Sequence, residues 1–93
     1  MAICWGNENI GNQNPSGIVN SWYYYDVYPN VNYPQNVTFA TAPLVIGNVS
    51  SNNLTYGQRI EGSTSKITHI AFGSPQSTVT SVNFSWIAIG RLA

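Results

Sequence analysis

The residue types that carry out catalysis or bind metals are few in this sequence and lie far apart along it. The carboxylates are Glu8, Asp26 and Glu61, whereas a glycosidase needs two carboxyl groups that flank one cleft. The single histidine, His69, and the single cysteine, Cys4, are too few for a two-histidine or cysteine-based zinc site or for an internal disulfide. A Ser/His/Asp triad would also need a nucleophile elbow, which the sequence lacks. We therefore expect no enzymatic activity, no metal site and no cofactor.

One short segment, Trp22-Tyr23-Tyr24-Tyr25-Asp26, brings four aromatic rings next to a carboxylate. In a strand, Trp22 and Tyr24 point to one face, and Tyr23 and Tyr25 point to the other. One face is expected to pack in the core, and the rings of the other face would form a platform on which the C–H face of a sugar stacks. Asp26 would then accept hydrogen bonds from sugar hydroxyls.

Arg59 is the best candidate for a second polar contact, because a guanidinium group can hold two neighbouring oxygens at once. Glu61 is expected to be a solvated rim residue, although strand geometry also allows it to point the same way as Arg59. A sugar carries no charge, so its recognition needs a few fixed polar groups beside an aromatic plane. The sequence predicts a shallow, neutral saccharide site whose residues are Arg59, Asp26, Trp22, Tyr23 and Tyr25.

The composition of the chain agrees with a neutral binding surface. The 93 residues include three Lys or Arg and three Asp or Glu, so the formal net charge is zero and charged residues make up only 6%. This balance argues against nucleic acid and anionic membranes as partners, because both are bound through clusters of basic residues. No stretch approaches the ~20 apolar residues of a membrane-spanning helix. The length predicts a single domain over residues 1–93, and its neutral surface favours association.

Strand and turn signals run through the whole sequence, and no window carries the apolar periodicity of a helix. Asn7–Gly17 is rich in Asn, Gly, Pro and Ser and is expected to be a loop. Six or seven strands without a helix indicate an all-β fold, an antiparallel sandwich or barrel. The expected strands are Ala2–Gly6, Ile18–Val27, Val37–Ala40, Leu44–Val49, Leu54–Glu61, Ile67–Phe72 and Val82–Ile89.

Alternation along the last expected strand separates a core face from an outer face. Val82, Phe84 and Trp86 share the core face, and we interpret Trp86 as a packing residue. Beyond Trp86 the outer face also becomes apolar, with Ile87 and Ile89. A strand that is apolar on both faces is either central in the sandwich or covered by a second subunit.

In the strand before it, Ile70 and Phe72 fall on one face, and Ile67, His69 and Ala71 fall on the other. Because its neighbours on that face are apolar, we expect His69 to be a satisfied interior or interface histidine rather than a ligand. The other lone reactive residue, the cysteine of the opening apolar strand, is expected to be a buried small hydrophobic residue.

Several motifs, in sequence order, resemble the H-type lectin domain. They are Asn36-Val37-Thr38-Phe39-Ala40, Pro43-Leu44-Val45, Gln58-Arg59-Ile60 and Phe84-Ser85-Trp86-Ile87-Ala88-Ile89-Gly90. The closing Trp86-Ile87-Ala88-Ile89-Gly90, together with the opening Ile3-Cys4-Trp5-Gly6, is most similar to the C-terminal domains of bacteriophage tail fibres.

This resemblance implies a six-stranded antiparallel sandwich that forms a trimer, with sugar sites near the subunit boundaries. Arg59 corresponds to an arginine of H-type lectins that touches N-acetylgalactosamine. Tyr28 stands where the family has an acidic sugar ligand, with Asp26 two residues away, and the family's Trp-His pair before the last strand has no counterpart here. The resemblance therefore implies sugar binding but does not imply specificity for galactosamine.

From these observations we expect the receptor-binding head of a phage tail fibre or baseplate, which recognises a bacterial cell-surface saccharide. The chain would then be a homotrimer located on the virion at the tail tip, and the C-terminal part of a longer fibre protein. Two alternatives remain open at this point. One is a purely structural cap that trimerises and terminates a fibre, and the other is a free cellular H-type lectin in an extracellular setting.

Overall fold

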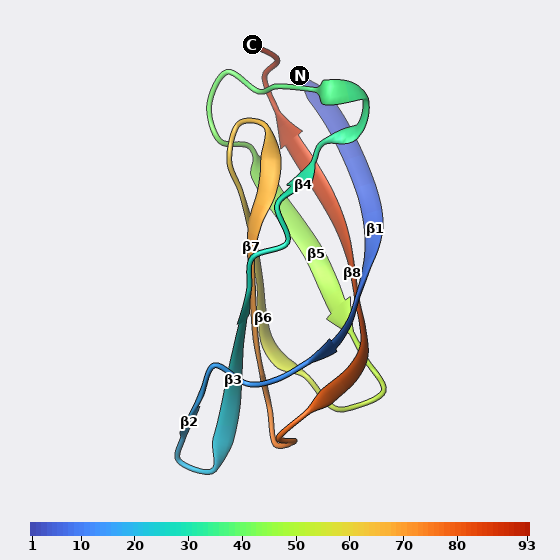
Figure 1. The fold of residues 1–93 in the computed structure, drawn as a ribbon. Coiled ribbons are helices and arrows are strands. Elements are labelled where there is room, and N and C mark those ends of the chain that lie inside the picture. Colours follow the sequence, from blue (N-terminus) through green and yellow to red (C-terminus); the bar gives the residue numbers. More distant parts are fainter.

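The two ends of the chain pair with each other along most of the molecule. In the computed structural model, which describes residues 1–93, β1 (Ala2–Gln13) and β8 (Val79–Gly90) run antiparallel from the Ala2–Gly90 pair to the Gln13–Val79 pair. β5 (Leu44–Ser50) pairs with the other edge of β8, so the first sheet has the order β1-β8-β5. Both termini consequently lie at the same end of a molecule that measures 43 × 22 × 16 Å (Figure 1).

The second sheet is built around β7 (Lys66–Ser74). On one side of β7, β3 (Trp22–Val27) and β4 (Val31–Asn32) pair with successive parts of it, and β6 (Tyr56–Gly62) pairs with its other side. β2 (Gly17–Val19) forms a hairpin with β3 and is the edge strand. This hairpin lies at the opposite end of the molecule from the two termini (Figure 1).

The core lies between the two sheets and consists of the inward-facing residues of each. In β8 the alternation is confirmed, because Phe84, Trp86 and Ala88 are at most 2% exposed while Ser85 and Ile87 face outward. The expected all-β fold with two antiparallel sheets is therefore present, consistent with a β-sandwich. The buried hydrophobic residues form one cluster: Cys4, Tyr25, Tyr33, Phe39, Val49, Ile67, Ile70, Phe72, Val79, Val82, Phe84, Trp86 and Ala88.

Three segments differ from the sequence-based expectation. The expected strand Ile18–Val27 is instead a hairpin, because a turn at Asn20 and Ser21, both with positive φ, separates β2 from β3. The expected loop Asn7–Gly17 is wrong over its first half, because β1 continues to Gln13 with irregular pairing around Gly11, whose φ is +70°. Polar side chains alone do not end a strand whose backbone is paired over its full length with β8. The expected strand Val37–Ala40 is also wrong, since this segment follows a short 3₁₀ turn, η1 (Pro34–Asn36), and pairs only through a single bridge between Phe39 and Leu92. No helix of the structure is long and apolar enough to cross a membrane.

β7 changes face near its start. Glu61 pairs with His69, but the next residue of β6, Gly62, pairs with Ile67, so Thr68 is an extra residue on β7. Such a bulge reverses the side on which the following residues point. Ile67 is consequently buried together with Ile70, whereas His69 points outward. The expected grouping of Ile67 with His69 is therefore wrong.

Candidate functional site

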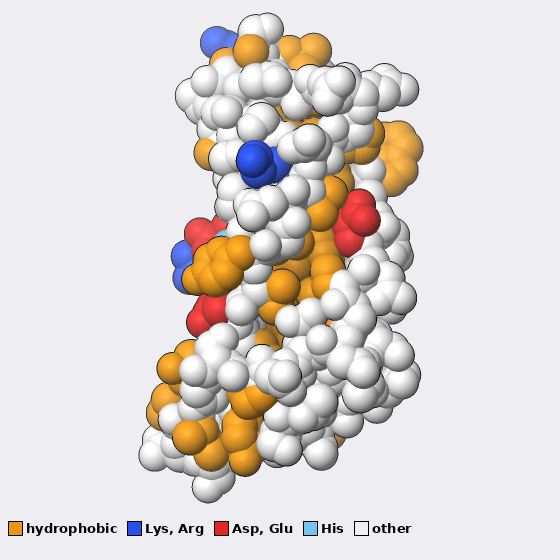
Figure 2. All heavy atoms as spheres, viewed as in Figure 1, with side chains coloured by type: hydrophobic (Ala, Val, Ile, Leu, Met, Phe, Trp, Pro, Cys, Tyr) orange, Lys and Arg blue, Asp and Glu red, His pale blue; other side chains and the backbone are white.

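The outer face of the second sheet gathers three of the six Lys, Arg, Asp and Glu residues of the chain and its single histidine. Cross-strand pairing places Asp26 of β3 and Arg59 of β6 on either side of Ala71 in β7. Two residues before Ala71 in β7, His69 pairs with Glu61. Figure 2 shows acidic, basic and histidine side chains together on one side of the molecule. The strand register thus brings together four residues that are far apart in the sequence.

His69 is the centre of a hydrogen-bonded network. Its Nδ1 lies 2.7 Å from Oε1 of Glu61, and its Nε2 lies 2.8 Å from Oδ1 of Asp26. A histidine donates from both ring nitrogens only when it is protonated. The geometry therefore favours the imidazolium form, held between two carboxylates. Both ring nitrogens of His69 therefore have partners, as expected for a satisfied histidine, but the residue lies on the outer face of the sheet and not in the interior.

The network changes the acidity of its own members. The hydrogen bond to Glu61 is the main cause that raises the pKa of His69 above its usual 6.5, and the hydrogen bond and charge of Asp26 act in the same direction. The same hydrogen bond, together with Arg59, lowers the pKa of Glu61. The Tyr28 ring stacks on His69 with a centroid distance of 4.9 Å and an angle of 13°. Tyr28 therefore covers one side of the imidazolium.

Arg59 extends the network at the β6 edge. Its Nη2 donates to Oε2 of Glu61 at 3.2 Å, and its side chain remains 68% exposed. Glu61 and Arg59 therefore point the same way, which the sequence analysis left open. The charges of the network (Asp26, His69, Glu61 and Arg59) cancel when His69 is protonated. The arginine still has free N–H groups that face solvent, because only one of its nitrogens is bound to Glu61.

Exposed aromatic rings lie beside the network, toward the β2–β3 hairpin. Trp22 and Tyr24 are 45% and 44% exposed, and Trp22 contacts Tyr56 of β6 edge-to-face with a centroid distance of 4.9 Å. Tyr24 and Tyr56 both pair with Gly73 of β7. We call this surface the polar–aromatic face; it comprises Trp22, Tyr24, Asp26, Tyr28, Tyr56, Arg59, Glu61, His69, Ala71 and Gly73.

Of the three rings predicted to contact sugar, only one lies on this face. Tyr25 is 1% exposed, its ring stacks on Phe72, and its hydroxyl donates to the carbonyl of Gln76. Tyr23 is half-buried and packs against the core cluster. The alternation of the segment was assigned correctly, but its inner pair of rings was included in the predicted site. We correct the ring set to Trp22 and Tyr24, which flank the same side as Asp26.

Tyr56 belongs to the same surface although sequence reasoning did not select it. It lies three residues before Arg59, and regular alternation would place the two on opposite faces. The pairing is irregular between these residues, and Gly57 between them has a φ of +59°. A bulge with glycine in the left-handed region adds one residue and restores the common face. A glycine directly after an aromatic residue was the only signal for this in the sequence.

The outer face of the first sheet is different in kind. Cross-strand pairing forms one row of Ile3, Ile89 and Leu44 and a second row of Trp5, Ile87 and Ile46. These rows lie side by side on the solvent side of the sheet, and Trp5 is 69% exposed. We call this surface the apolar face; it comprises Ile3, Trp5, Leu44, Ile46, Ile87 and Ile89.

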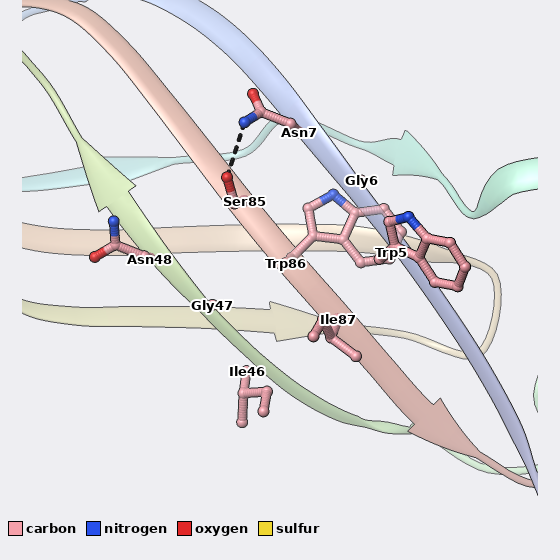
Figure 3. A pocket seen from close by; sticks show the side chains of 9 residues that line it. All are labelled: Trp5, Gly6, Asn7, Ile46, Gly47, Asn48, Ser85, Trp86 and Ile87. Carbon is pink, nitrogen blue, oxygen red and sulfur yellow. Dashed lines mark hydrogen bonds between the residues drawn. The ribbon is translucent and has the colours of Figure 1, made fainter.

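The apolar face ends at a row of polar residues. Asn7, Ser85 and Asn48 follow the second row, and Nδ2 of Asn7 donates to Oγ of Ser85 at 2.8 Å. A hollow of about 650 Å³ lies between Trp5 and this row (Figure 3). The face therefore combines exposed hydrophobic surface with a polar border.

Trp86 of the closing motif lies on the core side of this sheet, and its indole N–H does not face the hollow. It is 2% exposed, and its indole N–H is buried without a hydrogen-bond partner. The ring lies on Gly6, where an added Cβ would come within 2.7 Å of Cζ2. Gly6 is therefore required by the ring next to it, and the interpretation of Trp86 as a packing residue is confirmed.

No protein-family model and no curated protein matches this chain.

Proposed function

We propose that the protein is a receptor-binding head that recognises a bacterial surface saccharide through the polar–aromatic face. The observation that carries this proposal is the arrangement of Asp26, His69, Glu61 and Arg59 as one charge-cancelling network beside exposed rings. The tail-fibre resemblance of the closing and opening motifs supports a virion setting. In that setting the chain is the C-terminal part of a longer fibre protein.

The chemistry of the face suits a neutral ligand. Arg59 has free N–H groups for two vicinal oxygens, and Asp26 keeps one carboxylate oxygen that His69 does not occupy. Because the charges of the network cancel, it offers strong donors and acceptors without a net field that would favour an ionic ligand. Trp22 supplies an apolar plane on the same face, toward the β2–β3 hairpin, for the C–H face of a sugar.

The apolar face supports the second part of the proposal, a homotrimer. Its two rows place six large apolar side chains next to one another across three strands, which is the kind of contiguous patch that marks an interface. A neutral chain has little charge repulsion to keep its copies apart. With three-fold symmetry, three copies of a weak saccharide site act together, and the overall affinity rises by orders of magnitude.

The proposal is tested on a printed array of bacterial surface glycans with the wild-type protein and Arg59→Ala. We expect glycan binding by the wild-type protein and a loss of about 10- to 100-fold in the variant, because a hydrogen bond to a charged group contributes about 1.5–3 kcal/mol. The melting temperature should hardly change, since an exposed ion pair such as that of Arg59 and Glu61 contributes little to stability.

Ile18→Ala is the matched control, because Ile18 is exposed on the β2–β3 hairpin and pairs with the inward-facing Tyr23. Unchanged binding by Arg59→Ala would move the site to another surface. If the wild-type trimer binds no glycan, the protein is the structural cap of a fibre, an alternative for which the apolar face is sufficient.

A further inference from the structure

The polar–aromatic face has two chemically different ends, and they lie at different positions along β7. His69 and Ala71 mark the charged end, and Gly73 marks the aromatic end. Along this strand, Gly73 is two positions from Ala71, about 7 Å, and four positions from His69, about 13 Å. A single pyranose ring is too short to contact both ends.

The space above the aromatic end is open. A Cβ added to Gly73 would meet only two backbone oxygens, those of Tyr23 at 3.6 Å and Tyr56 at 3.8 Å. No side chain lies within 4 Å of that position, although Trp22 and Tyr56 meet nearby. The missing side chain of Gly73 therefore leaves the flanks of these rings accessible from the sheet.

The rings at this end are held in place by the protein. Trp22 is fixed by its edge-to-face contact with Tyr56, which crosses from β3 to β6. The ring of Tyr24 lies directly on Gly17 of β2, where a larger residue would displace it, so Gly17 also holds this ring in place. Rings that are already ordered lose little further freedom when a ligand stacks on them.

We propose that the ligand of this face is a glycan chain of at least two sugar units that lies along β7. This inference rests on the proposed function and deepens it. One unit lies over Ala71 between Asp26 and Arg59, and the next lies over Gly73 against Trp22. The two positions are two residues apart on β7, about 7 Å, comparable to the separation of neighbouring pyranose rings in a chain. The polar end selects hydroxyl positions, and the aromatic end adds affinity through stacking.

A second protein is a weaker candidate for this occupant. The face has no contiguous apolar rows, since its centre along β7 consists of Ala71 and Gly73 and its charged members are already paired with each other. Three rings (Trp22, Tyr24 and Tyr56) lie at one end of a strip that otherwise offers hydrogen bonds, and the fourth, Tyr28, covers His69 at the charged end. This separation of polar and stacking groups along one line fits a chain of repeated, partly polar and partly apolar units.

Two variants separate the ends. Trp22→Ala removes the stacking plane, and Gly73→Val fills the open space with a β-branched side chain that a strand accommodates well. The φ of Gly73 is not positive, so the substitution introduces no backbone strain there. Ile18→Ala remains the matched control on the same hairpin.

The probe is an array of neutral and acidic glycans from monosaccharides to hexasaccharides, followed by calorimetric titration of the tightest binders. We expect neutral oligosaccharides to bind about tenfold more tightly than their constituent monosaccharides, the gain expected from one added stacking contact. Trp22→Ala and Gly73→Val should reduce oligosaccharide affinity to the monosaccharide level, and Ile18→Ala should leave it unchanged.

Each other outcome overturns a defined part of the proposal. Equal affinity for monosaccharides and oligosaccharides, or a preference for oligosaccharides that survives both variants, would overturn the extended ligand but keep the proposed function. A preference for acidic glycans that is lost in Arg59→Ala but not in Trp22→Ala would likewise confine the ligand to the charged end. No binding to any glycan would overturn the extended ligand together with the proposed function.

Discussion

The outer faces of the two sheets follow the same alternation but carry opposite chemistry. On the first sheet, each row across β1, β8 and β5 repeats one type of residue, as in the row of Trp5, Ile87 and Ile46. On the second sheet, the central strand β7 carries the small Ala71 and Gly73 beyond His69, and the other large side chains of the face stand on the strands beside it. The first pattern makes a continuous apolar surface, and the second makes a strip bordered by functional groups.

The comparison shows that the exposure of an aromatic side chain alone does not identify a binding surface in this protein. Both faces expose a tryptophan, Trp5 on the first sheet and Trp22 on the second. Their neighbours differ, because Trp5 lies among isoleucines whereas Trp22 lies near a network of charged residues. In the proposed function the apolar face makes the subunit contacts and the polar–aromatic face makes the ligand contacts, and the following experiments test this division.

The largest effect is expected from a charge placed on the apolar face. Ile87→Lys should convert the proposed trimer into a monomer at micromolar concentration, because burial of an unpaired ammonium group at an interface is strongly unfavourable. Sedimentation velocity would show the mass fall to one third. Ile87 is 40% exposed in the single chain, so the domain itself should still fold.

Leu54→Lys is the control for the oligomer, because Leu54 is 62% exposed and lies outside both faces. This variant should keep the mass of the wild-type protein. A trimer that persists in Ile87→Lys would remove the apolar face as the interface, and a monomeric wild-type protein would remove the trimer from the proposal.

The second effect contrasts one glycine from each sheet. Gly6→Ala should lower the free energy of unfolding by about 1–3 kcal/mol, because the added methyl group overlaps the ring of Trp86. Gly73→Ala should be neutral or stabilising by up to about 1 kcal/mol, since its methyl group enters open space and restricts the unfolded chain. Urea denaturation of both variants provides the measurement. A similar loss in both would mean that the surroundings of Gly73 are not open.

The smallest effect is expected from pH. The pKa of His69 is raised in the folded state, so its contribution to stability is complete below about 6.5 and is lost as pH rises through the folded value. The pKa of Glu61 is lowered, so its contribution is present above about 4.5 and is lost as pH falls through the folded value. Together the two groups predict greatest stability between about pH 4.5 and 6.5.

The single histidine makes this prediction simple to measure. One imidazole signal should titrate in NMR spectra, above pH 6.5, and Glu61→Gln should lower that midpoint. The melting temperature of the wild-type protein should fall by a few degrees as His69 loses its proton, and His69→Gln should flatten that part of the profile. A midpoint at or below 6.5 in the wild-type protein would contradict the hydrogen-bonded network.

The sequence was sufficient to predict the fold class and most strands. The β-branched and aromatic runs that end at turn residues, such as Leu44–Val49 and Val82–Ile89, correspond to β5 and β8. The strand content of Asn7–Gln13 was missed because its polar residues resemble a loop, whereas pairing with β8 along its whole length determines its conformation. Local composition does not report a partner that lies about seventy residues away.

The site was predictable only in part, because two bulges rearrange its faces. Arg59 and Asp26 were selected by their chemistry and lie in one cross-strand row. The extra residues at Gly57 and Thr68 bring Tyr56 to the outer face and turn Ile67 into the core while His69 points outward, and regular alternation excludes both results. The choice of Tyr23 and Tyr25 failed for another reason, since alternation separates two faces without saying which of them meets the second sheet.

The long ladder between β1 and β8 also determines how the domain carries mechanical load. Its hydrogen bonds are perpendicular to the strands, and the Ala2–Gly90 pair lies at the end where both termini emerge. A force that separates the two termini would open this ladder one pair at a time. A force between one terminus and the β2–β3 hairpin at the opposite end instead runs along the strands and loads many bonds in shear at once. A domain anchored by one terminus and pulled through a ligand near the hairpin therefore bears tension along its more resistant direction.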